Sequence, residues 1–175
     1  MSALFVDLLG EAEFAKLPPR VQALHRATGT RSYRGEAQVV RGANWLARVC
    51  GVVTSQPPAA QNAPLRVEIA TSAHGERWTR EFAGHPMRST MWARDGLLCE
   101  RLGLVTFAFA LSIEAGVLNW RIRRVWALGM PLPARWFAGV RACESQVDDR
   151  YHFDVVARLP LAGLLVHYRG WLDVD

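Results

Sequence analysis

An arginine stands on an otherwise apolar strand face in the segment from Leu118 to Leu128. Alternate residues of this segment are Leu, Trp, Ile, Arg, Trp and Leu, so Arg124 lies between Ile122 and Trp126. Alternate side chains of a strand point to the same face, which places Arg124 among apolar neighbours. Burying a charge costs free energy unless the charge is paired and hydrogen-bonded. We therefore expect Arg124 either to meet a carboxylate or to bind a ligand.

Three further polar residues follow the same pattern on other predicted strands. Arg80 lies between Trp78 and Phe82 on one strand face. Glu144 and Tyr168 each share a strand face with aliphatic residues. In a curved sheet one face of each strand points inward. We therefore expect the faces that carry these polar side chains to point inward.

Two structural interpretations compete with a functional one. Glu144 could pair with Arg80 or Arg124 in a buried ion pair, or a strand could face solvent while an arginine stem covers a tryptophan. The functional interpretation is a ligand cavity with apolar aromatic walls and a few polar anchors, which is typical of small-molecule sites. The candidate lining residues of this cavity are Trp78, Arg80, Trp120, Arg124, Glu144 and Tyr168.

The segment Gly129 to Phe137 follows the Arg124 strand and is rich in proline and aromatic residues. Prolines on both sides of Leu132 stiffen the exit from the strand. Trp136 and Phe137 could plug the end of the sheet structure. They could instead form a lid or a docking patch, because large exposed aromatic residues mark contact surfaces.

Catalytic and metal-binding signatures are absent from the sequence. It has no Gly-rich nucleotide loop, nucleophile elbow or zinc-protease motif, and its five histidines have no metal-ligand spacing. Asp148 and Asp149 are adjacent in a predicted turn, which does not suit a catalytic carboxylate pair. We expect no cofactor and no metal. Glu144 and Tyr168 are the acid/base candidates if the protein is an enzyme, but the sequence favours a protein that is not one.

The composition excludes several classes of protein. The chain has 175 residues, a net charge of +5 and only one lysine, and its arginines are dispersed among acidic residues, so we expect no nucleic-acid partner. Three separated cysteines suit reduced thiols. The N-terminus has no secretory signal pattern, and the longest apolar run, residues 102–113, is too short for a transmembrane segment. We expect a soluble, cytoplasmic protein.

The predicted elements change from helices to strands along the chain. Residues 1–30 have helical spacing, Ser32 to Arg41 reads as a first strand, and a helical excursion near residues 43–53 has Asn44 as its N-cap. A loop covers residues 54–64. Short strands follow from Leu65, joined by tight turns such as Asp95-Gly96. The stretch from Leu97 to Ile113 is either one strand bent at Gly103 or two strands.

Strands joined by such short turns must be antiparallel. A long meander curls or closes, which also protects its edges. The fold class is mainly β (α+β): an antiparallel meander of about 8–10 strands that forms a barrel or half-barrel, with two to three short N-terminal helices. We expect one domain over residues 1–175, with the helical segment in residues 1–30 and the barrel in residues 31–175.

A set of ordered motifs resembles a bacterial family. They are LPPRVQALH (17–25), VVRG (39–42), RWTREF (77–82), LGMPLP (128–133), FDV (153–155) and LPLAGLLVHYRGWL (159–172). Together they resemble domain-of-unknown-function family 4166. The resemblance implies a domain that occurs alone or fused behind a saccharopine-dehydrogenase-like NAD(P)-binding domain. It implies no catalytic residues, and this chain lacks a dinucleotide fingerprint of its own.

Three functional hypotheses follow. The first is a cytoplasmic barrel that binds a lipophilic small molecule, with an acidic group as one option and Arg80 or Arg124 as anchor. The second is an accessory domain of an NAD(P)-dependent reductase, which the fusions in the resembling family suggest. The third is a stand-alone enzyme of unknown reaction.

Overall fold

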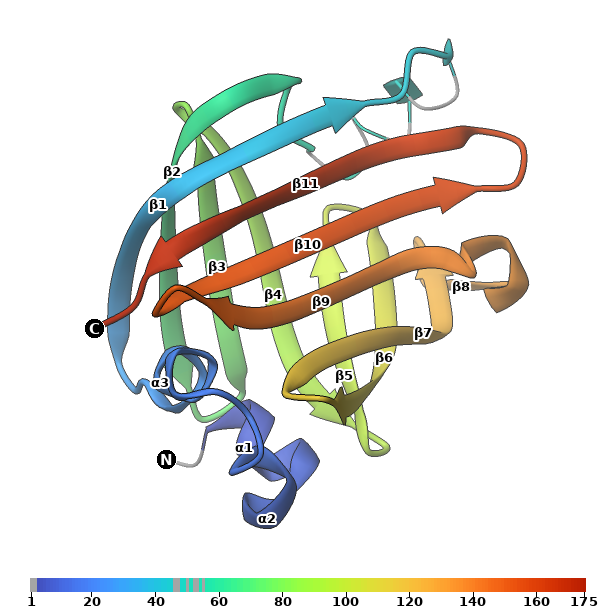
Figure 1. The fold of residues 1–175 in the computed structure, drawn as a ribbon. Coiled ribbons are helices and arrows are strands. Elements are labelled where there is room, and N and C mark those ends of the chain that lie inside the picture. The colour runs from blue at the N-terminus through green and yellow to red at the C-terminus, as the bar shows by residue number, and fades with distance from the viewer. Residues whose placement is uncertain (1–2, 46–47, 50, 52–53, 55) are drawn as a thin grey trace.

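The protein folds into a closed antiparallel β-barrel of ten strands with three short helices at one end (Figure 1). The computed structural model describes residues 3–45, 48–49, 51, 54 and 56–175. The described helical elements are α1 (Leu4–Leu9), α2 (Glu11–Phe14), α3 (Pro19–Arg26) and the 3-10 helix η1 (Ala134–Phe137). The strands are β1 (Thr30–Arg41), β2 (Ala60–Ser72), β3 (Gly75–Phe82), β4 (His85–Arg94), β5 (Leu97–Leu102), β6 (Val105–Glu114), β7 (Val117–Ala127), β8 (Met130–Leu132), β9 (Gly139–Val147), β10 (Arg150–Leu159) and β11 (Gly163–Asp173).

Two pairings close the barrel and leave one short strand outside it. β1 pairs with β11 from Arg34 opposite Asp173 to Arg41 opposite Val166, which joins the first strand to the last. β7 pairs with both β6 and β9. β8 pairs only with the end of β7, as an appendage to the wall. The prediction of an antiparallel barrel is confirmed, and the sheet is closed rather than open.

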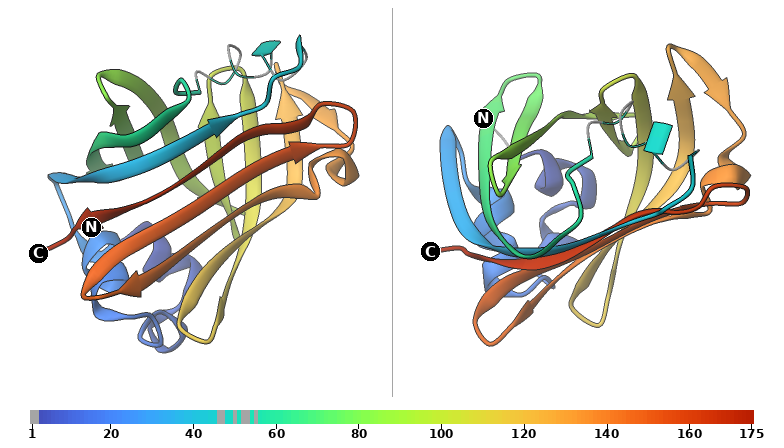
Figure 2. Two further views of the ribbon diagram at one scale, coloured as in Figure 1. Left: turned by 45° about the horizontal axis from the view of Figure 1, so that its top comes forward. Right: turned by 90° about the horizontal axis from the view of Figure 1, so that it is seen from above.

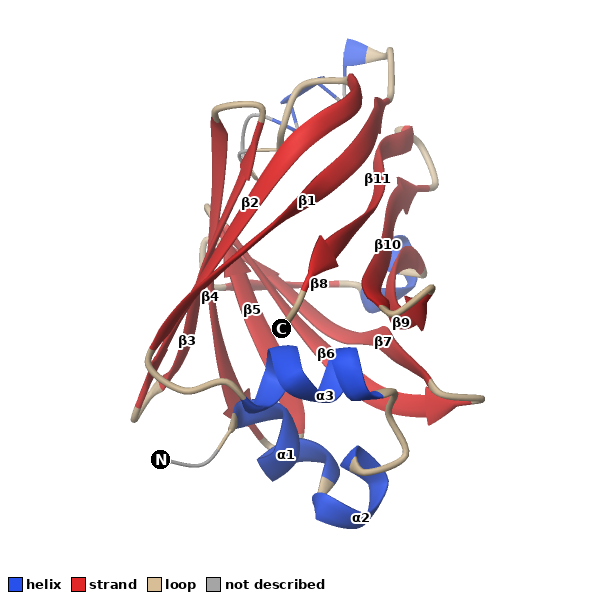
Figure 3. Ribbon diagram, turned by 60° about the vertical axis from the view of Figure 1, so that its left-hand side comes forward, coloured by secondary structure: helices blue, strands red, loops and turns tan. Residues whose placement is uncertain are grey.

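Because the strands alternate in direction, their connections gather at two ends. The end that carries the helices, here called the helix end, has the turns at residues 73–74, 95–96, 115–116 and 148–149 (Figures 1 and 3). The opposite end, here called the mouth, has the connections at residues 42–59, 83–84, 103–104, 128–138 and 160–162 (Figure 2). Asp95 and Gly96 both have positive φ, as the predicted two-residue turn requires.

The helices close the helix end with an apolar face. Phe5, Phe14, Val21 and Leu24 are fully or almost fully buried and join the core of the barrel. Arg20 of α3 fixes this cap from outside: its guanidinium bonds both carboxylate oxygens of Asp149, at 3.2 and 2.7 Å, and the backbone carbonyl of Val174 at 2.6 Å. The helical cap therefore excludes water from one end of the barrel.

Two sequence expectations need adjustment at the mouth. The stretch from Leu97 to Ile113 is two strands, because Gly103 and Leu104 form a two-residue turn between β5 and β6. The predicted loop over residues 54–64 is too long, since β2 begins at Ala60.

The excursion near residues 43–53 lies only partly within the described chain. Trp45, Arg48, Val49 and Gly51 are helical, and the Arg48 amide donates to the carbonyl of Asn44. The remaining residues of the predicted helix, Leu46, Ala47, Cys50, Val52 and Val53, lie outside the described residues. No helix in the described part of the chain is long and apolar enough to cross a membrane.

Candidate functional site

A cavity of about 360 Å³ occupies the interior of the barrel between the helical cap and the mouth. Its walls are mainly aliphatic and aromatic side chains from most strands of the barrel. Of the six residues expected to line it, five do so: Trp78, Arg80, Trp120, Glu144 and Tyr168. Other lining residues include Val67, Phe82, Met87, Glu100, Leu102, Phe107, Phe109, Phe137, Ala142, Tyr151, Phe153 and Val166.

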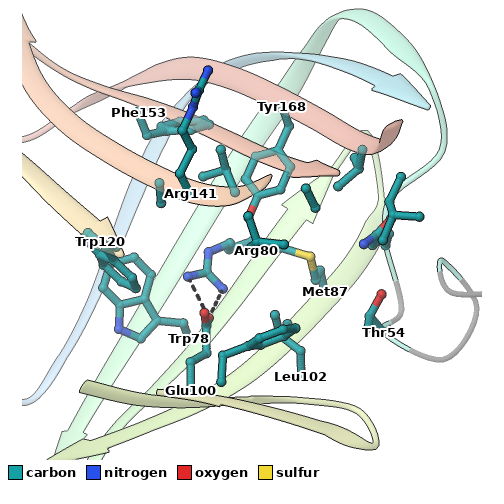
Figure 4. A pocket seen from close by; sticks show the side chains of 18 of the residues that line it. Thr54, Trp78, Arg80, Met87, Glu100, Leu102, Trp120, Arg141, Phe153 and Tyr168 are labelled. Atoms are coloured by element: carbon teal, nitrogen blue, oxygen red, sulfur yellow. Dashed lines mark hydrogen bonds and ion pairs between the residues drawn. The ribbon is translucent and has the colours of Figure 1, made fainter. Parts of the chain in front are cut away.

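Inside the barrel, Arg80 forms an ion pair with Glu100. Both terminal nitrogens of the guanidinium lie 3.3 Å from Oε1 of Glu100, and Nη1 also donates to the Ser89 hydroxyl at 2.9 Å (Figure 4). The guanidinium carbon lies 4.7 Å from the centroid of the Trp78 ring, at cation–π distance. Arg80 therefore has an ion-pair partner, but that partner is Glu100 on β5 rather than Glu144.

Glu144 is paired with a histidine from the helical cap. Nε2 of His25 lies 2.5 Å from Oε2 of Glu144, and both side chains are buried. Nδ1 of His25 is also buried and has no hydrogen-bond partner among the described atoms. A bare Nδ1 lone pair costs less than an unpaired buried N–H, so the contact fits a neutral imidazole that donates from Nε2 to the Glu144 carboxylate.

Tyr151 completes this polar group. Burial raises the pKa of the Tyr151 phenol well above its ordinary value, and the nearby Glu144 charge raises it further. The phenol is thus held in its neutral form, with its hydroxyl bonded to Glu144. Glu144 has two protein partners, which is the usual arrangement for a buried carboxylate.

A third carboxylate, Glu76, lies under the same cap. Nε1 of Trp78 donates to Oε2 of Glu76 at 2.8 Å, and the Glu76 side chain is buried. Burial raises the pKa of Glu76 above its ordinary value; the hydrogen bond from Trp78 opposes this shift. The end of the cavity near the cap therefore holds more carboxylates than cations.

Tyr168 projects into the middle of the cavity from β11 (Figure 4). Burial raises the pKa of its phenol to about 12, so the hydroxyl stays protonated at neutral pH. Its ring packs edge-on against Phe82, with centroids 5.6 Å apart. No described side chain forms a hydrogen bond with the Tyr168 hydroxyl, which leaves it able to bond a guest molecule.

A glycine on the same strand makes room for the aromatic wall beside Tyr168. Gly170 lies opposite Phe153 on β10, and a Cβ at this position would lie 2.9 Å from Cζ of Phe153 and 2.1 Å from the carbonyl oxygen of Glu36. Only a residue without a side chain fits there. The Phe153 ring packs across the space that this leaves.

The expectation that Arg124 faces the interior is wrong. Register along β6 and β7 shifts between Ala108 and Phe109, which pair with Arg124 and Ile122, so Arg123 is an unpaired bulge residue. A bulge adds one residue and reverses the alternation beyond it. Ile122 lies before the reversal and Val125 lies after it, and both point inward. Arg124 is exposed instead and lies 3.3 Å from the Asp95 carboxylate.

Trp136 and Phe137 lie on opposite sides of the wall at the mouth. Phe137 is buried, lines the cavity and packs edge-on against Phe107 with centroids 6.1 Å apart. Trp136 is 47% exposed. Phe137 thus supports the plug interpretation, while Trp136 presents an aromatic surface to solvent at the mouth.

Sequence reasoning missed His25, Glu76, Glu100 and Tyr151. The sequence held a signal for Glu100, because Glu100 shares one face of β5 with Leu98 and Leu102. His25 follows Val21 and Leu24 on the apolar side of its helix, so its burial was also foreseeable. Which carboxylate each cation would meet depends on the barrel register and could not be foreseen.

Within the described residues no group of three His, Cys, Asp or Glu side chains could hold a metal ion. Cys99 and Cys143 are free, and burial raises the pKa of both thiols, which disfavours the nucleophilic thiolate. Cys50 lies outside the described residues. What the cavity offers a guest is an apolar wall with hydrogen-bonding groups at Arg80, Glu100 and Tyr168.

Comparisons with known proteins identify a family but no activity. No curated protein matches the chain. The crystal structure of Rv2717c from M. tuberculosis is similar, at 14% sequence identity and a TM-score of 0.45, over 91% of this chain and 99% of that one. The family described as "Domain of unknown function (DUF4166)" matches residues 17–172. That match spans nearly the whole chain, including the barrel and α3, and the chain therefore belongs to the DUF4166 family.

Proposed function

We propose that the protein binds a lipophilic small molecule in the barrel cavity. The observation that carries this proposal is a closed, largely apolar interior of about 360 Å³ that contains a few polar groups. Small-molecule sites have volumes of roughly 300–1,000 Å³ and this same mixture of apolar walls and sparse polar anchors.

The charges in the cavity favour a ligand without a carboxylate. Arg80 is already paired with Glu100, and Glu144 and the nearby Glu76 add carboxylates toward the cap, whereas Arg141, which also lines the cavity, is exposed at the mouth. An acidic ligand would meet this excess of negative charge in a medium of low dielectric constant. A neutral ligand with one hydrogen-bonding group would instead bond the Tyr168 hydroxyl or Arg80. The acidic option is therefore the weaker of the two.

A neutral fluorescent probe tests the proposal directly. N-phenyl-1-naphthylamine should bind the purified protein with enhanced emission, and native mass spectrometry should detect one probe molecule per chain. Ala142→Phe places a ring in the cavity beside Trp120 and should weaken probe binding by at least about tenfold, since an overpacked site excludes its guest.

The matched control is Ala110→Phe. Ala110 lies between Phe109 and Leu111 on β6 and does not line the cavity, so this variant should keep the wild-type affinity within about twofold. Equal binding by both variants, or no binding by the wild type, would overturn the proposal. Anilinonaphthalene sulfonate, which is anionic, should bind more weakly than the neutral probe.

A further inference from the structure

Large exposed apolar side chains gather at the mouth of the barrel. They come from the β5–β6 turn, the β7–β8 connection, η1 and the β10–β11 turn. Among the described residues, the comparably exposed Val147 is the only one at the helix end. Five of the residues at the mouth, here called the rim, are Leu104, Leu128, Met130, Trp136 and Leu161, with exposed fractions between 47% and 92%; Trp45 and Val49 of the 42–59 connection are exposed as well.

Part of the rim is one contiguous surface. The amide of Leu128 donates to the carbonyl of Leu104 at 3.0 Å, which holds the two turns together. Met130 pairs with Ala127 just beyond the same turn, and Trp136 follows on η1. The connections lie around one opening, opposite the helices (Figure 2). Exposed apolar patches of this kind mark contact surfaces.

Positive charge without partners surrounds the rim. Four exposed arginines stand on or beside its connections, and none forms an ion pair with a described carboxylate: Arg101, Arg135, Arg141 and Arg158. The connections at residues 42–59, 83–84, 103–104, 128–138 and 160–162 contain no Asp or Glu.

The helix end has the opposite character. Asp95, Glu114, Asp148, Asp149 and Asp173 lie at its turns and strand ends. Several arginines there are paired with these carboxylates, for example Arg121 with Glu114 at 3.1 Å and Arg150 with Asp173 at 3.1 Å, although Arg31 and Arg77 are not. Exposed apolar side chains are thus combined at the mouth with arginines that no described carboxylate pairs, whereas the helix end carries many carboxylates and one comparably exposed apolar side chain.

We propose that the rim docks on an anionic membrane surface. Leucine, methionine and tryptophan side chains gain free energy when they enter the boundary between headgroups and acyl chains, and tryptophan is favoured at that depth. Each arginine near an anionic bilayer adds electrostatic attraction to its headgroups. A bilayer supplies both chemistries at once over a broad, flat contact, which fits side chains distributed around an opening.

This docking would point the cavity at the bilayer. Leu132, Phe137 and Leu159 line the cavity and belong to the connections or strand ends at the mouth. A lipophilic guest could then pass between membrane and barrel without crossing water. The docking proposal rests on exposed residues at the mouth and does not depend on the proposal that the cavity binds a small molecule.

Vesicle co-sedimentation tests the docking. The protein should bind vesicles of phosphatidylcholine mixed with phosphatidylglycerol at least about tenfold more tightly than vesicles of phosphatidylcholine alone, and this preference should shrink as salt rises from about 0.1 M to about 1 M. Leu104→Asp combined with Leu128→Asp should abolish most of the binding. Val147→Asp, an equally exposed site at the helix end, should bind like the wild type.

A second pair of variants separates charge from folding. Arg135→Glu with Arg158→Glu should weaken binding to the anionic vesicles, whereas Arg31→Glu, an exposed arginine at the helix end, should have a much smaller effect. Thermal unfolding and affinity for N-phenyl-1-naphthylamine should stay unchanged in every variant. If the wild type binds neither vesicle, or the rim and control variants bind alike, the docking is overturned, and intact probe binding would still leave the proposed function standing. A protein partner that needs the rim in the absence of vesicle binding would also overturn it.

Discussion

Nε2 of His25 lies 2.5 Å from Oε2 of Glu144, and this buried contact joins helix α3 to strand β9. The two residues are far apart in the sequence, yet they form a buried polar link between the cap and the barrel wall. The Phe5 ring covers the imidazole, with centroids 3.7 Å apart. The contact therefore holds the helix end shut from inside.

Glu144→Ala should lower the free energy of unfolding by about 3 kcal/mol, because it leaves the buried His25 imidazole without its hydrogen-bond partner and removes the acceptor of Tyr151. Urea unfolding followed by circular dichroism measures this loss. Glu114→Ala, which breaks the exposed pair with Arg121, should cost only about 0.5 kcal/mol. Similar losses for the two variants would show that the His25 contact adds no stability.

Glu100→Leu should destabilise the protein more than Glu100→Leu combined with Arg80→Met. The single change leaves the Arg80 guanidinium buried without its carboxylate, at a cost of about 3 kcal/mol, whereas the double change removes both charges. A double-mutant cycle in urea provides the comparison. If the losses of stability from Glu100→Leu and Arg80→Met alone simply add in the double variant, the two side chains do not interact as a buried ion pair.

Glu76→Gln should make the protein more stable than the wild type at neutral pH and equally stable at acidic pH. Burial raises the pKa of Glu76, so the folded wild type binds this proton more tightly than the unfolded chain does. Its stability therefore falls as pH rises from the unfolded pKa through the folded one. The glutamine keeps an acceptor for Trp78 and carries no such penalty.

Urea unfolding at pH values from about 3 to 8 measures this difference. Asp149→Asn is the control of opposite sign. Arg20 lowers the pKa of Asp149, so the stability that this carboxylate contributes is present above the unfolded pKa and is lost as pH falls through the folded one. Parallel pH profiles for the two variants would contradict the environments assigned to them.

Deleting Arg123 should be tolerated far better than deleting Arg121. Removing the bulge residue leaves Trp120, Ile122 and Val125 in regular alternation toward the interior. Removing Arg121 instead turns Ile122 outward and an arginine inward, at a cost of about 3 kcal/mol or more. Thermal unfolding of the two deletion variants provides the comparison, and equal melting temperatures would argue against the bulge.

The sequence predicted the architecture because its information is local. Alternation along the strands, the turn at Asp95-Gly96 and the short connections together require an antiparallel meander, and closure follows from its length. The same alternation placed Trp78, Arg80, Trp120, Glu144 and Tyr168 on inner faces. It failed at Arg124, because one unpaired residue reverses a face and no composition signal at Arg123 announces it.

Partner choice inside the barrel was beyond local reasoning. Arg80 meets Glu100 because β3, β4 and β5 are adjacent in a fixed register, and Glu144 meets a helix that precedes strand β9 by more than a hundred residues. Both facts depend on closure and on the position of the cap. Alternation can show that a charge is buried, whereas the register decides which residue neutralises it.

The seam between β1 and β11 also dictates when the protein can finish folding. The first strand pairs with β2 on one side, but its other edge has to wait for residues 166–173, more than a hundred residues later. During synthesis on a ribosome the sheet would grow strand by strand with one unpaired edge at β1. Contacts between residues so distant in sequence make folding slow. The barrel would thus become sealed only after β11 has been released.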